Sequence, residues 1–390
     1  MNTNSLVKSL IDPSVPTFLL GEVPPRDGTP PGQALEICRK FVTRSRALAC
    51  DGYIVYDIQD EVGRSDEPRP FPFRKLTDPS GYASLVSKSS GKPCVVYKCI
   101  ADEHLEGWLD ECVETHGHRA VNVVGRSTPG ASGPTMSEAM RLVGARVSFG
   151  CVCIAERHTK EYADRRGFGA PREHENMLRK QGAGAQWFVS QAVYDPAPTI
   201  SLLKDYAAAA KARGLEPKKV ILTFTPVSRE KSLRFVKWLG VTVPKETEAA
   251  ILGCDTPEAR VEKSVDLLCD CLDAILRESI DVPLGISVES VSIFKAEINA
   301  VHDLFGKLQQ RILDARNLPW TVQWRCIQEE GCQRGGPPDD DDDDDGMAPP
   351  VVSAADRAMM MMMMMMALGA FIMALGVCVG MAGRFFFFSR

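Results

Sequence analysis

Short apolar runs alternate with longer amphipathic stretches along most of this 390-residue chain. The runs are rich in β-branched and aromatic residues, as buried strands are, and the stretches between them repeat apolar residues every three or four positions, as helices do. This alternation extends from residue 16 to about residue 314 and is typical of parallel strands joined by helical crossovers. The expected strands are 17–23, 53–58, 94–99, 120–124, 147–154, 187–191, 220–224 and 284–288.

Eight such strands with helices between them predict an α/β fold, a (β/α)8 TIM barrel, although alternation alone does not exclude an open doubly wound sheet. The clearest helical stripes run through 34–49, 261–275 and 298–312, and we interpret them as core faces. Polar or Gly/Pro-rich stretches at 59–80, 125–134 and 159–172 follow strand ends. A barrel enzyme holds its substrate in such loops.

The sequence changes character after the alternating region. We expect a lead-in at 1–15, the barrel domain at 16–316, a low-complexity linker at 317–357 and a hydrophobic tail at 358–390. The linker contains the aspartate run 339–345, which repels itself and stays solvated as a disordered segment. Residues 358–383 carry no charge and exceed the ~20 residues that cross a bilayer. Two hypotheses stand: a C-terminal transmembrane anchor, or low-complexity or mis-predicted sequence without selected function.

Composition narrows the class of protein. The net charge is -5, and no basic patch interleaved with aromatic residues occurs, which argues against a nucleic-acid partner. The thirteen cysteines lack metal-ligand spacing, and the N-terminus lacks a secretory pattern, so we expect reduced, mostly buried thiols in a cytoplasmic catalytic domain. No zinc motif, nucleophile elbow or Walker loop is found, and no metal site is predicted.

Several polar residues follow the expected strands and are candidates for chemistry. Glu22 ends the first apolar run, just before a pair of prolines, and Asp57, Glu156, His158 and Gln191 follow later strands. A glutamate and a glutamine that face one cavity suit a polar heterocycle, because a carboxyl group can act as general acid and an amide both donates and accepts hydrogen bonds.

Bland interpretations stand beside these candidates. Glu22 could simply be neutralised by Arg26, and His158 could cap a local loop. Lys180 lies in the last turn of a helix expected to end at Gly182, where a basic residue stabilises the helix terminus.

Five segments stand out in order along the alternating region: Glu22-Val-Pro-Pro-Arg26, Ala155-Glu156-Arg157-His158, 173–185, Ser190-Gln191-Ala192-Val193-Tyr194-Asp195 and Thr225-Pro226-Val227-Ser228. Together they resemble landmarks of the methylenetetrahydrofolate reductase family, and the resemblance covers about residues 16–314. The family implies a barrel that holds FAD, takes hydride from NAD(P)H and reduces 5,10-methylenetetrahydrofolate to 5-methyltetrahydrofolate.

The resemblance implies roles for particular residues. Glu22 matches the general acid that helps to open the imidazolidine ring, and Gln191 matches a glutamine that contacts the pterin. Outside the matched positions, Asp57, at the end of the second expected strand, and Arg126 are also expected at the folate site. The residues expected to hold FAD are Glu156, His158, Glu173 and Lys180.

The chain departs from the family's pattern at several places. Arg126 stands where the family has an aspartate near the flavin and folate, Val96 replaces a histidine and Ile154 replaces a tyrosine. Glu289 and Ser290 replace an Asn-Arg element after the last strand. The leading hypothesis is therefore a divergent flavin-linked oxidoreductase of one-carbon metabolism, with folate as substrate.

Two other hypotheses stay open. One is a non-catalytic folate- or nucleotide-binding barrel, free or tethered to a membrane, which the altered flavin contacts and the tail support. The other is a barrel lyase or transferase that uses a Schiff-base lysine, for which Lys98 is the residue at a strand end.

Overall fold

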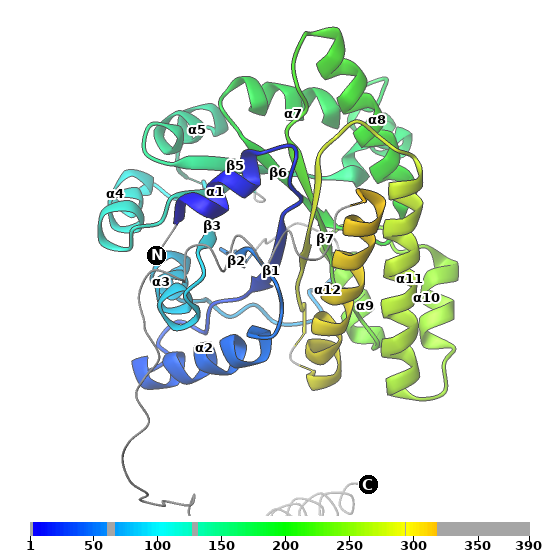
Figure 1. The fold of residues 1–390 in the computed structure, drawn as a ribbon, viewed down its shortest axis with the longest axis horizontal. Coiled ribbons are helices and arrows are strands. Elements are labelled where there is room, and N and C mark those ends of the chain that lie inside the picture. Colours follow the sequence, from blue (N-terminus) through cyan, green and yellow to red (C-terminus); the bar gives the residue numbers. More distant parts are fainter. Residues whose placement is uncertain (1–2, 61–66, 127–131, 293, 318–390) are drawn as a thin grey trace, which may run out of the picture. The chain divides into compact units, whose positions relative to one another are not determined.

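Eight parallel strands close into a barrel in the order β1 to β8, with β8 hydrogen-bonded back to β1 (Figure 1). The computed structural model describes residues 3–60, 67–126, 132–292 and 294–317. The predicted (β/α)8 TIM barrel is confirmed, and closure excludes the open sheet. The strands are β1 (Phe18–Glu22), β2 (Gly52–Val55), β3 (Cys94–Cys99), β4 (Ala120–Val124), β5 (Ser148–Cys153), β6 (Trp187–Ala192), β7 (Lys219–Phe224) and β8 (Leu284–Val288).

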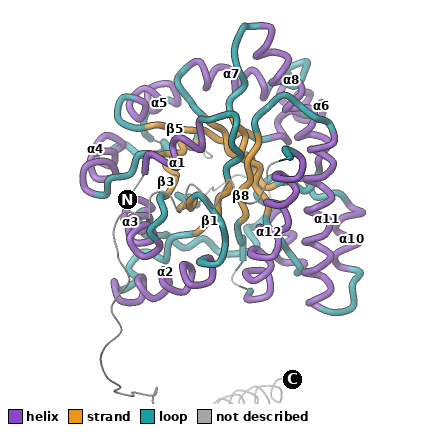
Figure 2. The backbone as a smooth tube through the Cα atoms, viewed as in Figure 1, coloured by secondary structure: helices purple, strands orange, loops and turns teal. Residues whose placement is uncertain are grey.

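Helices occupy the connections and surround the strands (Figure 2). Their starts follow the sequence: Thr135 forms a capping box with Glu138, and Thr256 caps the following long helix ahead of Pro257. The helices are α1 (Thr3–Ile11), α2 (Pro31–Ser45), α3 (Pro79–Ser90), α4 (Leu105–Asp110), the π-helix η1 (Glu111–Thr115), α5 (Met136–Gly144), the 3-10 helix η2 (Ala155–His158), α6 (Lys160–Arg166), α7 (Glu173–Gly182), α8 (Pro196–Ala212), α9 (Glu230–Trp238), α10 (Lys245–Leu252), α11 (Pro257–Arg277) and α12 (Lys295–Ala315).

The apolar core has two parts, one on each side of the barrel wall. Because successive side chains in a strand point to opposite faces, Leu20 packs in the outer cluster, between strands and helices, whereas Leu19 packs in the inner cluster. The expected lead-in contains a helix, α1, whose Leu6 and Leu10 join the inner cluster. A side chain added at Gly52, the first residue of β2, would meet Leu6, so α1 covers the amino end of the strands.

A buried lysine ties this amino end together. Lys219 Nζ, at the start of β7, donates to Val15 O at 2.6 Å and to Thr17 Oγ1 at 3.0 Å. It also donates to Ser9 O in α1. Burial lowers the pKa of Lys219 to about 8, because the charged ammonium is poorly solvated there.

The expected linker beyond residue 317 and the expected tail lie outside the described residues. Among the helices that the structure does describe, none is long and apolar enough to cross a membrane. The ten cysteines in the described part of the chain are all free, and all except Cys254 are buried.

Candidate functional site

The end of β1 presents neighbouring residues to opposite sides of the barrel wall. Leu19 faces inward and Leu20 outward, so Gly21 faces the interior and Glu22 faces the helix layer. Tyr82 on α3 donates a hydrogen bond to Glu22 Oε1 at 3.3 Å. Glu22 does lie at the carboxyl end of its strand, as predicted, but on the side away from the interior.

The surroundings of Glu22 make it a weak acid. Burial raises its pKa to about 8, although the hydrogen bond from Tyr82 and the charge of Arg44 act in the opposite direction. Arg26 is not among the groups that shift the pKa of Glu22, whose cationic neighbour is Arg44. The backbone of Arg26 forms a bridge with Leu76. A role of Glu22 as general acid stays a prediction.

Gln191 is engaged elsewhere. Its Nε2 donates to Leu239 O, just after α9, at 3.0 Å. Glu22 contacts Tyr82 on α3, so the structure does not bring the two side chains into contact with a common partner. That they face one cavity stays a prediction.

The two other expected folate contacts hold loops at the carboxyl ends of the strands. Asp57 accepts hydrogen bonds from Cys99 N at 2.8 Å and from Gln59 Nε2 at 2.6 Å. Burial raises the pKa of Asp57. Arg126 donates to the carbonyl oxygens of Gly133 and Pro134, which lead into α5. Both side chains therefore order loops next to strand ends.

The four residues expected to hold a flavin gather near the ends of β5 and α7. Glu156 Oε1 accepts a hydrogen bond from Thr242 N at 3.2 Å, and burial raises the pKa of Glu156. The buried His158 places Nε2 2.9 Å from Asp205 Oδ2 on α8. These contacts join η2 to neighbouring parts of the barrel.

The remaining two residues reach β5 from α7. Glu173 accepts a hydrogen bond from Ile154 N at 3.4 Å, and Lys180 donates to Val152 O at 2.6 Å. Both side chains belong to buried residues. Lys180 thus binds a strand carbonyl instead of capping its own helix.

His158, Glu173 and Lys180 are buried, and the atoms named above contact other parts of the protein. His158 Nδ1 is buried and makes no hydrogen bond within the described part of the chain. A role of these residues in holding FAD stays a prediction. Ligand atoms of His158, His174 and Asp205 do lie within 4.8 Å of one another, a spacing that a metal ion could use. The hydrogen bond between His158 and Asp205 accounts for two of these three residues without an ion.

Polar side chains that sequence reasoning missed lie inside the barrel. Both amide atoms of Asn122 and the hydroxyl of Thr223 are buried and make no hydrogen bond within the described part of the chain. The hydroxyls of Tyr56 and Ser287 are also buried, and the Tyr56 hydroxyl interacts with both Glu289 and Ser287. Thr223 and Ser287 are register partners on β7 and β8. The Tyr56 ring meets Tyr97 edge-on, with centroids 4.8 Å apart. Buried polar groups normally have partners, so the Asn122 amide and the Thr223 hydroxyl keep their hydrogen-bonding capacity for a ligand or water.

A carboxyl group adjoins these hydroxyls. Glu289 directly follows β8, and a Cβ added at Gly21 would lie 2.8 Å from Glu289 Cβ and 2.9 Å from Tyr56 Oη. The absent side chain of Gly21 therefore leaves room for both groups. Burial raises the pKa of Glu289 to about 7, with Tyr56 acting in the opposite direction. We call Tyr56, Asn122, Thr223, Ser287 and Glu289 the interior polar set.

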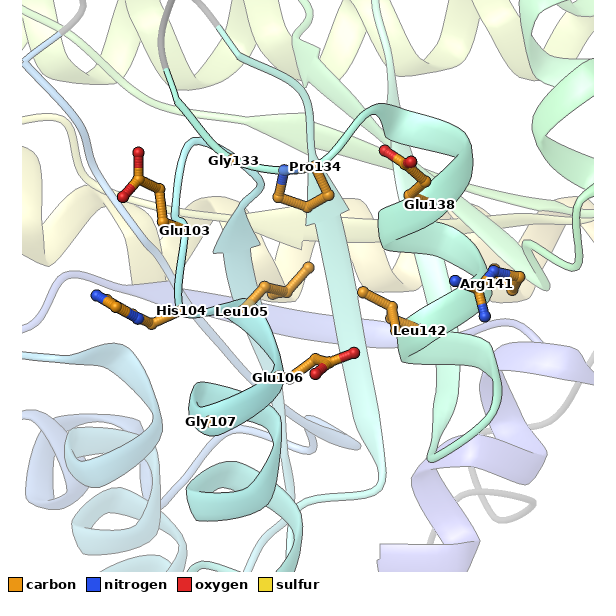
Figure 3. A pocket seen from close by; sticks show the side chains of 10 residues that line it. All are labelled: Glu103, His104, Leu105, Glu106, Gly107, Gly133, Pro134, Glu138, Arg141 and Leu142. Atoms are coloured by element: carbon orange, nitrogen blue, oxygen red, sulfur yellow. The ribbon is translucent and has the colours of Figure 1, made fainter.

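A surface hollow of about 680 Å³ lies between α4 and α5 (Figure 3). Its rim includes Glu103, Glu106, Glu138 and Arg141, all of them exposed. Glu138 also serves the capping box of α5. The hollow therefore lacks the buried polar groups that distinguish the interior.

No family model and no curated protein matches this chain. Among solved structures, it is similar to an uncharacterized protein from Clostridium thermocellum that binds two copies of 5-methyl-5,6,7,8-tetrahydrofolic acid. The two share 25% identity and a TM-score of 0.65, over 78% of this chain and 99% of that one. Dihydropteroate synthase from Thermus thermophilus matches at 17% identity, TM-score 0.38, over 77% of this chain and 95% of that one. OMP decarboxylase from Leishmania donovani matches at 12% identity and a TM-score of 0.41, over 80% of this chain and 99% of that one.

The sequence did contain a signal for part of the interior polar set. Asn122 interrupts the apolar run of β4. Thr223 in β7 and Ser287 in β8 are likewise polar residues inside buried strands. A polar residue inside a strand buried on both faces points to the barrel interior. Glu289 is marked in the sequence only as a departure from the family pattern.

Proposed function

We propose that this chain binds a reduced folate inside the barrel, at the carboxyl ends of the strands. The observation that carries the proposal is the likeness to the Clostridium thermocellum protein, which extends over 99% of that chain. That protein binds 5-methyl-5,6,7,8-tetrahydrofolic acid. The interior polar set supports the proposal, because barrels of this fold bind ligands at this end.

The chemistry of the interior suits a pterin ring. A pterin carries hydrogen-bond donors and acceptors around the edge of a flat heterocycle. The Asn122 amide offers one donor group and one acceptor, and the hydroxyls of Thr223 and Ser287 offer both. The Tyr56 and Tyr97 rings and the inner apolar cluster supply the apolar surroundings that ligand sites need.

The finer proposal concerns turnover. The order of the five family-like segments supports NAD(P)H-dependent reduction of 5,10-methylenetetrahydrofolate through FAD, which would supply the hydride. The second candidate is a barrel that binds folate without reducing it. The engagement of His158, Glu173 and Lys180 with the protein itself favours this second candidate.

Calorimetric titration of the purified full-length chain with 5-methyltetrahydrofolate tests folate binding. We expect saturable binding, and we expect Thr223→Val to weaken it about tenfold, because the variant leaves a ligand polar atom unpaired at constant side-chain volume. Arg141→Ala, in the surface hollow, is the matched control and should bind as the wild type does. Absence of binding by the wild type would refute the proposal.

The same preparation separates the two finer candidates. Flavin absorbance together with oxidation of NAD(P)H in the presence of 5,10-methylenetetrahydrofolate would establish the reductase. Folate binding by a colourless protein that oxidises neither NADH nor NADPH would establish the non-catalytic barrel.

A further inference from the structure

The interior face at the end of β1 has no side chain of its own. Gly21 faces the interior there, and the neighbouring strand β8 delivers Glu289 into the space beside it. The register of β1 and β8 pairs Leu20 with Val288, so Gly21 and Glu289 stand one step beyond the last pair. The interior carboxyl group therefore comes from the eighth strand, whereas the glutamate of the first strand points outward.

We propose that the protonated carboxyl group of Glu289, with the Tyr56 hydroxyl beside it, donates a hydrogen bond to a ring nitrogen or oxygen of the bound heterocycle. This inference rests on the proposed folate function and names the interior acid of that site. Glu22 is not that acid, because it is directed toward Tyr82 on α3.

The charges around Glu289 favour the protonated carboxyl group. The groups that face it are phenols: Tyr56 after β2, Tyr97 on β3 and Tyr194 after β6. No lysine, arginine or histidine within the described residues influences its pKa. With burial raising that pKa to about 7, much of Glu289 carries its proton at neutral pH.

The ligand that this arrangement suits has hydrogen-bond acceptors on its ring. A neutral carboxyl group, a phenol and the Ser287 hydroxyl can all donate, and the three lie together at the ends of β8 and β2. A reduced pterin offers such acceptors. An anionic group placed against Glu289 would raise the carboxyl pKa further.

The test is the pH dependence of 5-methyltetrahydrofolate binding by the full-length chain between pH 6 and pH 8.5. For the wild type we expect affinity to fall as pH rises through 7, approaching about tenfold per pH unit as Glu289 loses its proton. In Glu289→Gln the amide keeps a donor that does not titrate, so the slope should disappear. At pH 8.5 this variant should bind at least as tightly as the wild type.

Two further variants sharpen the result, and a third tests the competing acid. Gly21→Ala adds a methyl group that must displace Glu289 or Tyr56, and should weaken binding at least tenfold at pH 6. Tyr56→Phe, which removes only the hydroxyl, should weaken binding at pH 6 and keep the slope. In Glu22→Gln the wild-type slope should persist. Thermal melting of each variant checks that it is folded.

The outcomes separate the inference from the proposed function. A wild type that does not bind the folate refutes both. A wild type that binds, with a folded Glu289→Gln that keeps the wild-type slope, refutes the inference alone. Loss of the slope in Glu22→Gln instead would assign the acid to the first strand.

Discussion

The buried Glu22 makes the stability of the fold depend on pH. Its folded-state pKa is about 8, well above the ordinary value of 4.5, so between these values the folded chain holds a proton that the unfolded chain has released. Stability from this group therefore falls as pH rises from 4.5 to 8. We expect Glu22→Gln to weaken that fall and to raise the urea midpoint at pH 8.5 more than at pH 5.

The exposed Glu36 on α2 provides the matched control for this measurement. Glu36→Gln should leave the difference between the urea midpoints at pH 5 and pH 8.5 as it is in the wild type. If Glu22→Gln also kept the wild-type difference, the carboxyl group of Glu22 would be ionised at pH 5, and the buried environment described for it would be wrong.

The side of the wall on which Glu22 lies could not be predicted from the sequence. Phe18, Leu19 and Leu20 are all apolar and all buried, so β1 shows no alternation that separates inside from outside. The strand and its end were predictable from the apolar run and the prolines after it. Whether Gly21 or Glu22 faces the interior depends on pairing with neighbouring strands, which local pattern does not encode.

The sequence did not predict the helix α1, because the helix is short and its composition is ordinary. Leu6 is 1% exposed against the amino end of the barrel, whereas Ile11 at the end of the same helix is 40% exposed. We expect Leu6→Ala to destabilise the fold by about 2–4 kcal/mol, since it opens a cavity under the barrel. Ile11→Ala should cost under about 1 kcal/mol. Urea unfolding measures both effects, and equal effects would contradict the conclusion that α1 covers the amino end of the barrel.

A buried carboxylate at the start of α12 joins the loops that follow β7 and β8. Glu297 accepts hydrogen bonds from Ser228 N at 2.7 Å, Ser228 Oγ at 2.9 Å and Ser232 Oγ at 3.0 Å, and Ser292 Oγ also donates to it. The family-like segment 225–228 is thus a structural junction in this chain. Its sequence motif was visible, but its partner on a distant helix was not.

Glu297→Ala should destabilise the barrel by about 3 kcal/mol, because several buried donors lose their acceptor together. Glu230→Ala, at an exposed position on the neighbouring helix α9, is the control and should change stability by less than about 0.5 kcal/mol. Chemical unfolding of the two variants gives the comparison. A loss below about 1 kcal/mol in Glu297→Ala would mean that the four hydrogen bonds do not hold the junction.

At the scale of the whole molecule, the barrel carries both the core and the proposed site. The eight strands and the main helices between them followed from apolar periodicity, because every strand is buried on both faces, whereas closure of the sheet did not. The interior polar set runs against that pattern, since an unpaired buried polar group costs about 1–3 kcal/mol. A bound ligand that forms hydrogen bonds with these groups would stabilise the folded state.

We expect the residues after 317 to be dispensable for folate binding. The described residues end at residue 317, and every member of the interior polar set lies before that point. We expect a chain that ends at residue 317 to bind 5-methyltetrahydrofolate with the affinity of the full-length chain, within about twofold, in calorimetry. Loss of binding in the shortened chain would show that the barrel needs its tail.

Membrane fractionation of both forms tests the uncharged segment 358–383. Recovery of only the full-length chain with membranes would establish an anchor, and equal recovery of both forms without membranes would refute it.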